Sequence, residues 1–361
     1  MKVKVMVTGV GGGGHGEQIL KALRLASTEY EIVGSDMSPL SKGLQDIDYP
    51  YILPPASDRR YIDSLLAVCR RHGVQALFHG SEPELKAMSA NRLRIEAEGI
   101  FLPINPHHVI NTCMDKFKTY NFLKEHNLNP PRTERINSKA DILKVDYLPV
   151  VIKPSIGGGG SANIFLAQNQ KELKTFGEHL LDIYPEFIVQ QYVGTPDSEY
   201  TVGVLISMDG ELINSIAVKR TILSSLSNRI KVKNRTGNPD FGDFLAVSSG
   251  ISQGQIDRFP KVTEPCEAIA LKMGCRGSVN IQCRFVDNKV YIFEINPRFS
   301  GTTSLRAMVG YNEPDVLIRK HLLHENIKPR FSYQSGYILR GLEERYIAHC
   351  NFPYALEQLD Q

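Results

Sequence analysis

The sequence predicts an α/β domain with a parallel sheet, followed by a mainly antiparallel α+β region. In residues 1–105, strand-like apolar runs alternate with helix-like stretches, as in parallel sheets with right-handed crossovers. From residue 150 onward, the strand-like runs follow one another through short turns, which is typical of hairpins. The proline-rich stretch FLPINPHH separates the two textures, and we place a domain boundary near Asn105.

The elements of the first region follow from apolar spacing. Val3, Val5 and Val7 alternate as in a strand, and a helix-like stretch at residues 17–26 follows a run of glycines. EIVGSD and VQALFHG predict two more strands. DRRYIDSLLAVCRRHG has helical spacing and ends at Gly73, and residues 84–97 predict another helix.

The second region begins with a helix at residues 115–126, for which Asp115 is placed as the N-cap. PVVIKP and EFIVQQYV predict strands. EYTVGVLISMDGELINSIAVKR predicts two strands around a turn at residues 208–210. SVNIQCRF and VYIFEINPRFSG predict a further pair.

Composition limits the class of protein. The 361 residues allow two or three domains at roughly 100–200 residues each. The net charge of +3 argues against nucleic-acid binding through bulk charge, and no apolar run approaches the roughly 18 residues of a membrane span. We therefore expect neither nucleic-acid nor membrane partners. The six cysteines lack metal-ligand spacing, so we expect them to be free thiols in a cytoplasmic protein.

The first glycine loop, VTGVGGGGHGEQ, fits G-x-G-x-x-G in two registers between residues 9 and 16. Asp36 ends the next apolar run, where a dinucleotide fold places a ribose-binding acid. An NAD-dependent oxidoreductase is therefore one interpretation, but it depends on this loop alone.

The second glycine run, KPSIGGGGSAN, suits phosphate binding because glycines let backbone N–H groups approach and Lys153 adds charge. It lacks the G-K-[ST] ending of a P-loop, and a plain flexible turn would also fit. What favours a nucleotide site is the ordered set of polar residues around it: Lys116, Lys153, Glu199, Gln282, Glu294, Asn296 and Arg298.

The stretch EINPRFSG is the most specific element. Glu294 and Asn296 are two apart on a strand and face the same side, and their oxygens suit Mg²⁺. Pro297 ends the strand and presents Arg298. Apolar neighbours on both faces disfavour a solvated edge strand.

Taken in this order, the motifs DKFKTYNFLKEHNLNPPRT, PVVIKPSIGGGGSAN, FIVQQYVG, SEYTVGVL, NIQCRF, FEINPRFSG and GYNEPDVLIRKHL make the chain resemble the ATP-grasp superfamily. It is most similar to the branch of the carbamoyl-phosphate synthetase large subunit and stand-alone carboxylate–amine ligases. The resemblance covers essentially the whole chain. It implies an ATP-grasp fold with an N-terminal Rossmann-like domain at 1–105, a small lid subdomain at 106–193 and a C-terminal subdomain with the Mg²⁺ site at 194–361.

The resemblance also implies ATP and Mg²⁺ (or Mn²⁺) as cofactors and assigns roles by position. Lys116 and Lys153 would bind phosphates, and Glu199 would hold the ribose. Lys153 and Arg298 would be catalytic, with Arg298 facing the transferred phosphate. The closing loop would contribute Ser155, Gly158, Gly159 and Ser161. The hinge that binds adenine would consist of Gln190, Gln191, Tyr192 and Val193. The metal ligands would be Gln282, Glu294 and Asn296, and Gln282 and Glu294 would also contact the nucleotide.

Two positions depart from the usual pattern of the family. The hinge often carries glutamate, whereas this chain has Gln190 and Gln191, so the adenine amino group would meet an amide oxygen or a backbone carbonyl. The synthetase usually has arginine where this chain has Lys116 and Lys153, and lysine also binds phosphate as a point charge.

The metal assignment predicts a strand register. A three-residue turn at residues 287–289 would place Gln282 opposite Glu294 and Asn280 opposite Asn296. A two-residue turn would place Gln282 opposite Phe293, on the wrong face.

The implied reaction is ATP-dependent joining of a carboxylate to an amine (or a thiol) through an acyl-phosphate, with release of ADP and phosphate. A single-unit carbamoyl-phosphate-synthetase-like enzyme and a non-catalytic ATP sensor are the alternatives. The partners would be a small carboxylate and a small amine, and the chain could form a homodimer.

Substrate contacts are expected from two places. The first glycine loop offers Gly13 and His15 at a helix N-terminus suited to anions, whereas Asp36 has no site role. His79 ends the next strand and could face the same cleft, and the acidic pair Glu82 and Glu84 that follows it could contact the amine. The basic stretch 219–235 is either a solvated face or an anion site, with these candidates: Arg220, Lys231 and Arg235.

Overall fold

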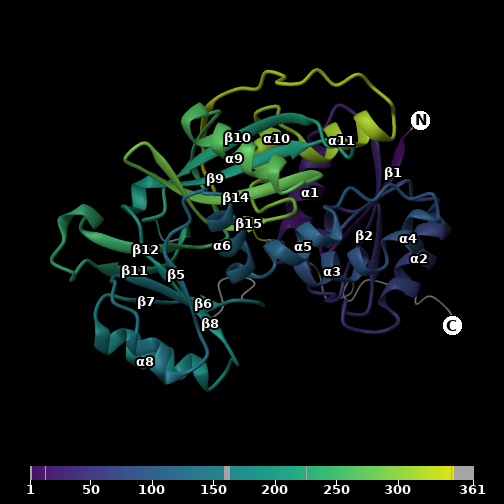
Figure 1. The fold of residues 1–361 in the computed structure, drawn as a ribbon. Helices are drawn as coiled ribbons and strands as arrows, with labels where there is room; N and C mark the ends of the chain where they lie inside the picture. Colours follow the sequence, from purple (N-terminus) through teal and green to yellow (C-terminus); the bar gives the residue numbers. More distant parts are fainter. Residues whose placement is uncertain (1, 13, 158–162, 225, 343, 345–361) are drawn as a thin grey trace.

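The protein is described by a computed structural model that covers residues 2–12, 14–157, 163–224, 226–342 and 344. A parallel sheet, a six-stranded antiparallel sheet and a four-stranded antiparallel sheet organise the chain (Figure 1). The predicted α/β region followed by an antiparallel α+β region is confirmed.

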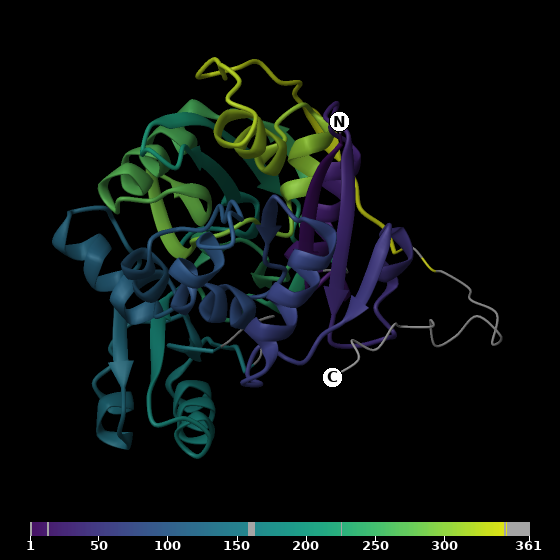
Figure 2. The same cartoon turned by 90° about the vertical axis from the view of Figure 1, so that its right-hand side faces the viewer.

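The N-terminal sheet has the order β3-β2-β1-β4, and its pairs are parallel. Figure 2 shows β1 and β2 side by side in purple. Helices cover both of its faces. The elements of this region are β1 (Val3–Thr8), α1 (His15–Arg24), β2 (Tyr30–Asp36), β3 (Tyr49–Ile52), α2 (Tyr61–His72), β4 (Ala76–Phe78), α3 (Glu82–Ala90), α4 (Arg92–Glu96) and a 3-10 helix at Lys42–Asp46.

The first glycine loop allows α1 to pack closely against β1, and the Asp36 carboxylate holds the loop closed. A Cβ on Gly16 would collide with the carbonyl oxygens of Thr8 and Gly9, so glycine lets α1 lie close against β1. The Asp36 carboxylate accepts from the backbone N–H of Gly11 at 2.8 Å and of Ser38 at 3.0 Å. Asp36 therefore holds the loop together.

The six-stranded sheet has the order β15-β14-β9-β10-β13-β16. On one face, the apolar side chains of α5, α6 and α9 form a core with β9, β14 and β15. On the other face, α1, α10 and α11 share one core with the parallel sheet, so the two sheets are packed as a unit. The elements are α5 (His107–Cys113), α6 (Lys116–Glu125), β9 (Glu199–Ile206), β10 (Leu212–Arg220), β13 (Gly254–Asp257), α9 (Pro260–Lys272), β14 (Gly277–Val286), β15 (Lys289–Asn296), α10 (Thr303–Met308), α11 (Glu313–His321) and β16 (Gly336–Ile338).

The four-stranded sheet has the order β5-β8-β6-β7 and a core of its own with α7 and α8. We call it the lid sheet. A hairpin of β11 and β12 packs on it through Leu166, Tyr192 and Leu245. The elements are β5 (Thr133–Ile136), α7 (Lys139–Leu143), β6 (Val150–Pro154), β7 (Phe165–Ala167), α8 (Gln170–Leu181), β8 (Phe187–Gln191), β11 (Asn228–Lys233), β12 (Phe244–Ser248) and 3-10 helices at Pro196–Ser198 and Pro239–Phe241.

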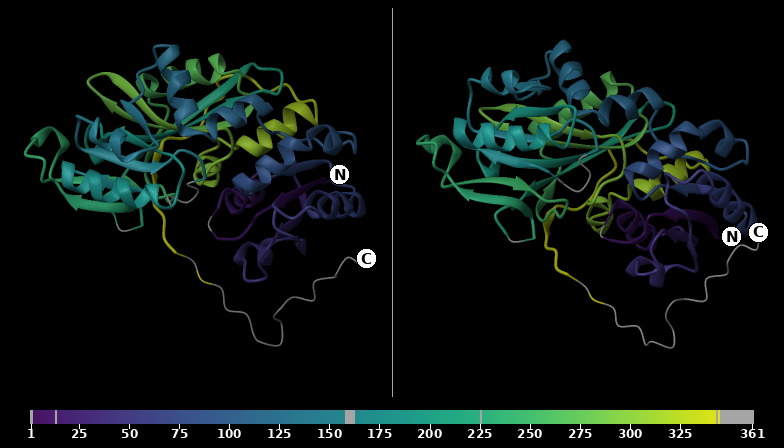
Figure 3. Two further views of the ribbon diagram at one scale, coloured as in Figure 1. Left: turned by 60° about the horizontal axis from the view of Figure 1, so that its bottom comes forward. Right: turned by 90° about the horizontal axis from the view of Figure 1, so that it is seen from below.

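The lid sheet and the parallel sheet lie at opposite ends of the molecule (Figure 3). Packing does not follow chain order here. Helices α5 and α6, inside the predicted lid segment 106–193, pack on the six-stranded sheet, whereas the β11–β12 hairpin from segment 194–361 packs on the lid sheet. The predicted domain limits stay predictions.

Two buried polar side chains fix this arrangement. Asn105, at the predicted boundary, donates to the carbonyl oxygens of Ser278 and Pro297, both at 3.0 Å. Arg306 is 0% exposed, pairs with Glu313 at 3.2 Å and donates to the Asn280 side chain at 2.7 Å. Its guanidinium lies against Gly203 of β9, where any Cβ would overlap it. A buried charge needs such partners, and these hold Asn280 in place on β14.

The β14–β15 hairpin corrects one prediction and confirms another. The turn has two residues, Asp287 and Asn288, both with positive φ as in a type I′ turn, so the predicted three-residue turn is wrong. A β-bulge at Phe293 then shifts the register by one residue. Gln282 consequently lies opposite Glu294, and Asn280 opposite Asn296, as predicted.

Two further expectations concern the described residues. None of the helices described is both long and apolar enough to cross a membrane. The cysteines in this part of the chain, which excludes Cys350, are buried free thiols: Cys69, Cys113, Cys266, Cys275 and Cys283.

Candidate functional site

A pocket lies between the six-stranded sheet and the lid sheet, and Glu82, the first residue of α3, also lines it. It joins side chains from β6 and β8 with others from β9, β14 and β15. Residues two apart on a strand point to the same side of a sheet, so each strand can present several of these side chains to the pocket. The structure brings these predicted residues together in its lining: Lys116, Lys153, Gln190, Gln191, Tyr192, Val193, Glu199, Gln282, Glu294 and Arg298.

Lys153, on β6, is a buried cation with neutral partners. Its Nζ donates to the Gln190 side-chain oxygen at 2.9 Å and to the Phe293 carbonyl at 3.4 Å. The bulge matters here, because Phe293 is the extra residue that it inserts. Burial lowers the pKa of Lys153 to about 8, although the Glu294 carboxylate opposes the shift.

Ser155 connects the start of the second glycine run to α6. Its hydroxyl donates to Asp115 at 2.8 Å, and its carbonyl accepts from the Lys116 N–H at 2.9 Å. Asp115 caps α6 by accepting from the N–H groups of Phe117 and Lys118, which confirms the predicted cap. Ser155 is 1% exposed, so it fixes where Lys116 enters the pocket. Gly158, Gly159 and Ser161 lie outside the described residues.

The predicted hinge, at the end of β8, carries side chains with different tasks. The Gln190 amide bridges Lys153 and the Thr133 hydroxyl, so its oxygen is already used by the lysine. Gln191 is exposed. Tyr192 is buried, and its hydroxyl bonds to the backbone of Ala246 on β12. The hinge is thereby tied to the β11–β12 hairpin.

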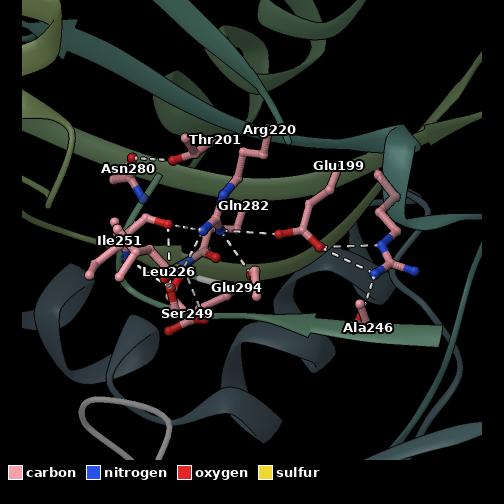
Figure 4. A network of polar contacts seen from close by, with 12 residues as sticks. Glu199, Thr201, Arg220, Leu226, Ala246, Ser249, Ile251, Asn280, Gln282 and Glu294 are labelled. Carbon is pink, nitrogen blue, oxygen red and sulfur yellow. Dashed lines mark hydrogen bonds and ion pairs between the residues drawn. The ribbon is translucent and has the colours of Figure 1, made fainter. Parts of the chain in front are cut away.

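Glu199 is held between two buried arginines. It pairs with Arg220 at 3.1 Å (Figure 4). It also pairs with Arg284 at 3.2 Å, and its side chain is 2% exposed. Arg220 also donates to Ser248 and to two carbonyl oxygens, at Ser249 and Ile251. The contacts of Arg220, proposed from sequence as a substrate residue, are those of a structural ion pair.

Arg284 is a lining residue that the sequence reasoning missed. It lies over the Tyr192 ring, 4.2 Å from its centroid, and donates to the Val193 carbonyl at 3.0 Å. Its position two residues after Gln282 on β14 was the available signal, because it places both on one face. Residues 248–250, which also line the pocket, lie at the end of β12 and directly after it, and they had no such signal.

Of the predicted metal ligands, Gln282 and Glu294 line the pocket as opposite residues on β14 and β15, whereas the buried Asn296 is not among the described lining residues. The Gln282 amide donates to Glu294 at 3.2 Å (Figure 4). Asn296, two residues after Glu294, accepts from Arg298 at 3.2 Å. No group of three or more His, Cys, Asp or Glu side chains forms a metal site among the residues described. The set of one carboxylate and two amide oxygens fits a hard cation such as Mg²⁺ that keeps waters and phosphates as further ligands.

Arg298 extends from the end of β15 toward the N-terminal region. It donates to the Glu82 carboxylate at 2.9 Å and to the Phe299 carbonyl at 2.9 Å. Burial disfavours the charge of Glu82, but the adjacent Arg298 outweighs it, and the pKa of Glu82 is lowered. Glu82 is thus a stable anion in the pocket.

Two histidines, one at the helix start after the first glycine loop and one after β4, lie near the Arg298–Glu82 pair. The imidazoles of His15 and His79 contact each other at 3.1 Å, and both are buried. Burial, followed by the positive Arg298, lowers the pKa of His15 well below its usual range and that of His79 to about 3, so both rings are neutral. Neither is among the described lining residues of the pocket, and Gly13 lies outside the described residues.

The two remaining basic candidates are exposed and do not line the pocket within the described chain. Lys231 lies 4.8 Å from the Phe244 ring centroid, across the β11–β12 hairpin. Arg235, after β11, pairs with Glu172 of α8 at 2.5 Å. The structure therefore does not bring them to the other predicted site residues.

Two family models match the chain. Residues 113–302, more than half of its length, match the model described as "ATP-grasp domain". Residues 7–103 match the model described as "PylC-like, N-terminal domain".

Curated relatives are similar over part of their own length. The carbamoyl phosphate synthase large chain of Thermoplasma volcanium is 23% identical over 309 residues, which are 81% of this chain and 27% of the relative. A Methanocaldococcus jannaschii protein described as uncharacterized is 26% identical over 229 residues, or 62% of this chain and 50% of the relative. The chain spans half or less of these relatives.

Solved structures share the fold at low identity. The L-amino acid ligase of Bacillus licheniformis has a TM-score of 0.61 at 18% identity and covers 91% of this chain and 78% of its own. The biotin carboxylase domain of Hydrogenobacter thermophilus 2-oxoglutarate carboxylase, in complex with MgADP, ADP and bicarbonate, has a TM-score of 0.60 at 15% identity, covering 88% and 69%. The D-alanine–D-alanine ligase of Bacillus anthracis has 0.54 at 15% identity, covering 90% and 98%.

Proposed function

The chain belongs to the ATP-grasp family, and from this premise we propose that it is an ATP-dependent ligase that activates a carboxylate as an acyl-phosphate. An amine then captures the acyl group, with release of ADP and phosphate. One observation carries the proposal: a single pocket unites Lys153, Glu294 and Arg298 with the hinge strand end.

The residues of the pocket divide the work. Lys116 and Lys153 offer cations for the ATP phosphates, and the hinge backbone at residues 190–193 would meet the adenine. Glu199 would hold the ribose, and its two arginine partners would fix its orientation. Phosphoryl transfer needs positioning and charge neutralisation more than covalent help, which suits a pocket rich in charged groups.

A bound Mg²⁺ would neutralise phosphate charge, held by Gln282, Glu294 and Asn296. Arg298 adjoins this set through Asn296 and would stabilise the charge of the transferred phosphate and of the acyl-phosphate. The loop at residues 155–161 would close over the triphosphate, which keeps water from the acyl-phosphate.

Three alternatives that also use ATP remain distinguishable. A thiol could take the place of the amine as nucleophile. Carbamoyl-phosphate chemistry is a second alternative, because the chain is similar to 27% of a carbamoyl phosphate synthase large chain. A sensor that binds ATP without turnover is the third, and the grouping of Lys153, Glu294 and Arg298 in the pocket argues against it. A cytoplasmic location and a homodimer are further predictions.

The test measures ADP release and hydroxamate formation with a panel of carboxylates and hydroxylamine, which captures acyl-phosphates whatever the natural acceptor is. We expect carboxylate-dependent ADP release that Lys153→Ala and Glu294→Ala each reduce by at least about 100-fold. Lys171→Ala, an exposed lid-sheet lysine on α8, is the matched control and should keep full activity. Undiminished turnover in both pocket variants would contradict the mechanism. ATP binding without turnover on any carboxylate would favour the sensor, and binding of NADH would favour the oxidoreductase.

A further inference from the structure

We propose that Glu82 and Arg298 form a subsite for a substrate that carries an ammonium group beside its reacting carboxylate, that is, an amino acid. This inference rests on the proposed function and specifies the class of carboxylate. The structural basis is an ion pair inside the pocket that joins the N-terminal region to the end of β15.

The structure separates the two acidic candidates that follow β4. Glu84 is 9% exposed and accepts from the Gly80 N–H at 3.0 Å and the Ser81 hydroxyl at 2.9 Å, within the cap of α3. The side chain of Glu82, the first residue of α3, is 35% exposed and lines the pocket. Glu84 therefore stabilises the helix start, and Glu82 is the one that can meet a ligand.

Glu82 is also the pocket carboxylate that can accept further hydrogen bonds. The described lining holds three glutamates, and two have other tasks: Glu199 is paired with two buried arginines, and Glu294 lies in the predicted metal set. Within the described chain, the Glu82 Oε1 accepts a hydrogen bond from the Arg298 Nη2 at 2.9 Å. A carboxylate has room for further donors on both oxygens.

The adjacency of the two charges selects the ligand. A carboxylate that binds at Arg298 must lie next to the negative Glu82, and like charges at such a distance disfavour binding. An ammonium group on the neighbouring carbon of the substrate offsets this penalty, because Glu82 then has a further cation in addition to Arg298 and the nearby Lys116. A carboxylate without it is rejected by the repulsion.

The surroundings keep that selection intact. The neighbouring His15 and His79 rings are buried and in contact with each other, and neither carries charge at neutral pH. They therefore add no cation to the two that act on Glu82 in the pocket, Arg298 and Lys116. Because Arg298 keeps Glu82 ionised, Glu82 is a weak base and acts by charge recognition rather than by accepting a proton.

The experiment compares amino acids with the same molecules in which hydrogen or hydroxyl replaces the amino group, using ATP, Mg²⁺ and hydroxylamine. For the native chain, we expect kcat/KM to favour the amino compound by at least about 100-fold. Glu82→Gln should reduce that preference to about tenfold or less, mainly by raising KM for the amino acid, with KM for ATP unchanged. Glu82→Asp, which keeps the charge, should restore part of it.

Glu98→Gln is the matched control, because it breaks an exposed glutamate–arginine pair of the same region, with Arg70, and should change nothing. Equal use of carboxylates with and without an amino group, or an effect of Glu82→Gln only on KM for an amine acceptor, would overturn the subsite while the ligase stands. Absence of ADP release with every carboxylate would instead overturn the proposed function, and the subsite with it.

Discussion

The Lys153–Gln190 contact shows how one side chain sets the chemistry of another. Sequence reasoning assigned Gln190 to the adenine, whereas its amide oxygen accepts from Lys153 at 2.9 Å. A neutral amide holds the ammonium group in position without stabilising its charge as a carboxylate would. Burial therefore prevails, and the pKa of Lys153 falls to about 8.

This shift predicts that ATP affinity decreases above pH 8. Lys153 loses its proton as pH rises through about 8, and with it the charge that attracts phosphate. KM for ATP, measured between pH 7 and 10 at fixed free Mg²⁺, should rise across that value. Lys153→Arg keeps its charge and should show a flat profile up to pH 10. A pH-independent KM in the unchanged chain would refute the assignment.

The same pKa shift makes the folded protein more stable as the pH rises, whereas it weakens the attraction of ATP. Between pH 8 and the ordinary lysine value of 10.5, the unfolded chain binds the Lys153 proton and the folded chain does not. The contribution of Lys153 to the free energy of unfolding therefore increases with pH in this window. Below pH 8 both states are protonated and its contribution is constant.

Arg220 gives a second prediction at this scale, because its contacts are structural. Arg220→Ala would leave part of the Glu199 charge uncompensated in the interior and should lower the free energy of unfolding by about 3 kcal/mol, read from urea denaturation. Arg229→Ala, an exposed arginine on β11, should have almost no effect. Normal stability with a selective rise in KM for the carboxylate would instead support the substrate role first given to Arg220.

Individual site residues could be predicted where spacing or motif order carried the signal. Ten lining residues follow from the family pattern, and Arg284 was within reach of the two-residue strand period. The contact of Ser155 with Asp115 was not, because the two are 40 positions apart in the sequence and meet only through folding. In the basic stretch 219–235, the sequence did not distinguish the buried Arg220 from the exposed Lys231 and Arg235.

At the scale of elements, the β14–β15 hairpin reaches the expected register by another route. With regular pairing, only a three-residue turn would place Gln282 opposite Glu294. The chain instead uses a two-residue turn and inserts Phe293 as a bulge nearer the site. A bulge has little sequence signature, because any residue can be the extra one, so its position could not be predicted. It also supplies the carbonyl that Lys153 contacts.

The turn itself can be tested at Asn288, where φ is +57°. Asn288→Val should lower the free energy of unfolding by about 1–2 kcal/mol, because β-branched residues disfavour this conformation. Asn288→Gly should be neutral or slightly stabilising, since glycine adopts it without strain. Urea denaturation measures both changes. Equal stability of the two variants would mean that the turn does not have this geometry in solution.

For the whole molecule, the arrangement of cores was less predictable than the fold class. Periodicity separated the parallel sheet from the antiparallel region, and the structure confirms that division. It did not show that the β11–β12 hairpin packs on the lid sheet, or that α1 shares a core with the six-stranded sheet. Such contacts join segments far apart in the chain, and local spacing carries no information about them.

Because the pocket lies between regions with separate cores, a nucleotide bound there should stabilise the whole molecule. ADP with Mg²⁺ at about 100 times its Kd should add about 2.7 kcal/mol to the free energy of unfolding. Thermal unfolding with ADP should show a smaller shift when EDTA removes the metal, and Glu294→Gln should lose that metal dependence. Equal shifts with and without EDTA would exclude the metal site.

Gly203 on β9 has a consequence for which substitutions the chain can tolerate. A strand interior ordinarily disfavours glycine, yet here the missing side chain is the space that the Arg306 guanidinium occupies. Gly203→Ala would push that guanidinium away from Glu313 and Asn280 although it touches no ligand. The strand that carries Gln282 would lose one of its anchors, so positions 203 and 306 are free to diverge in related sequences only as a pair.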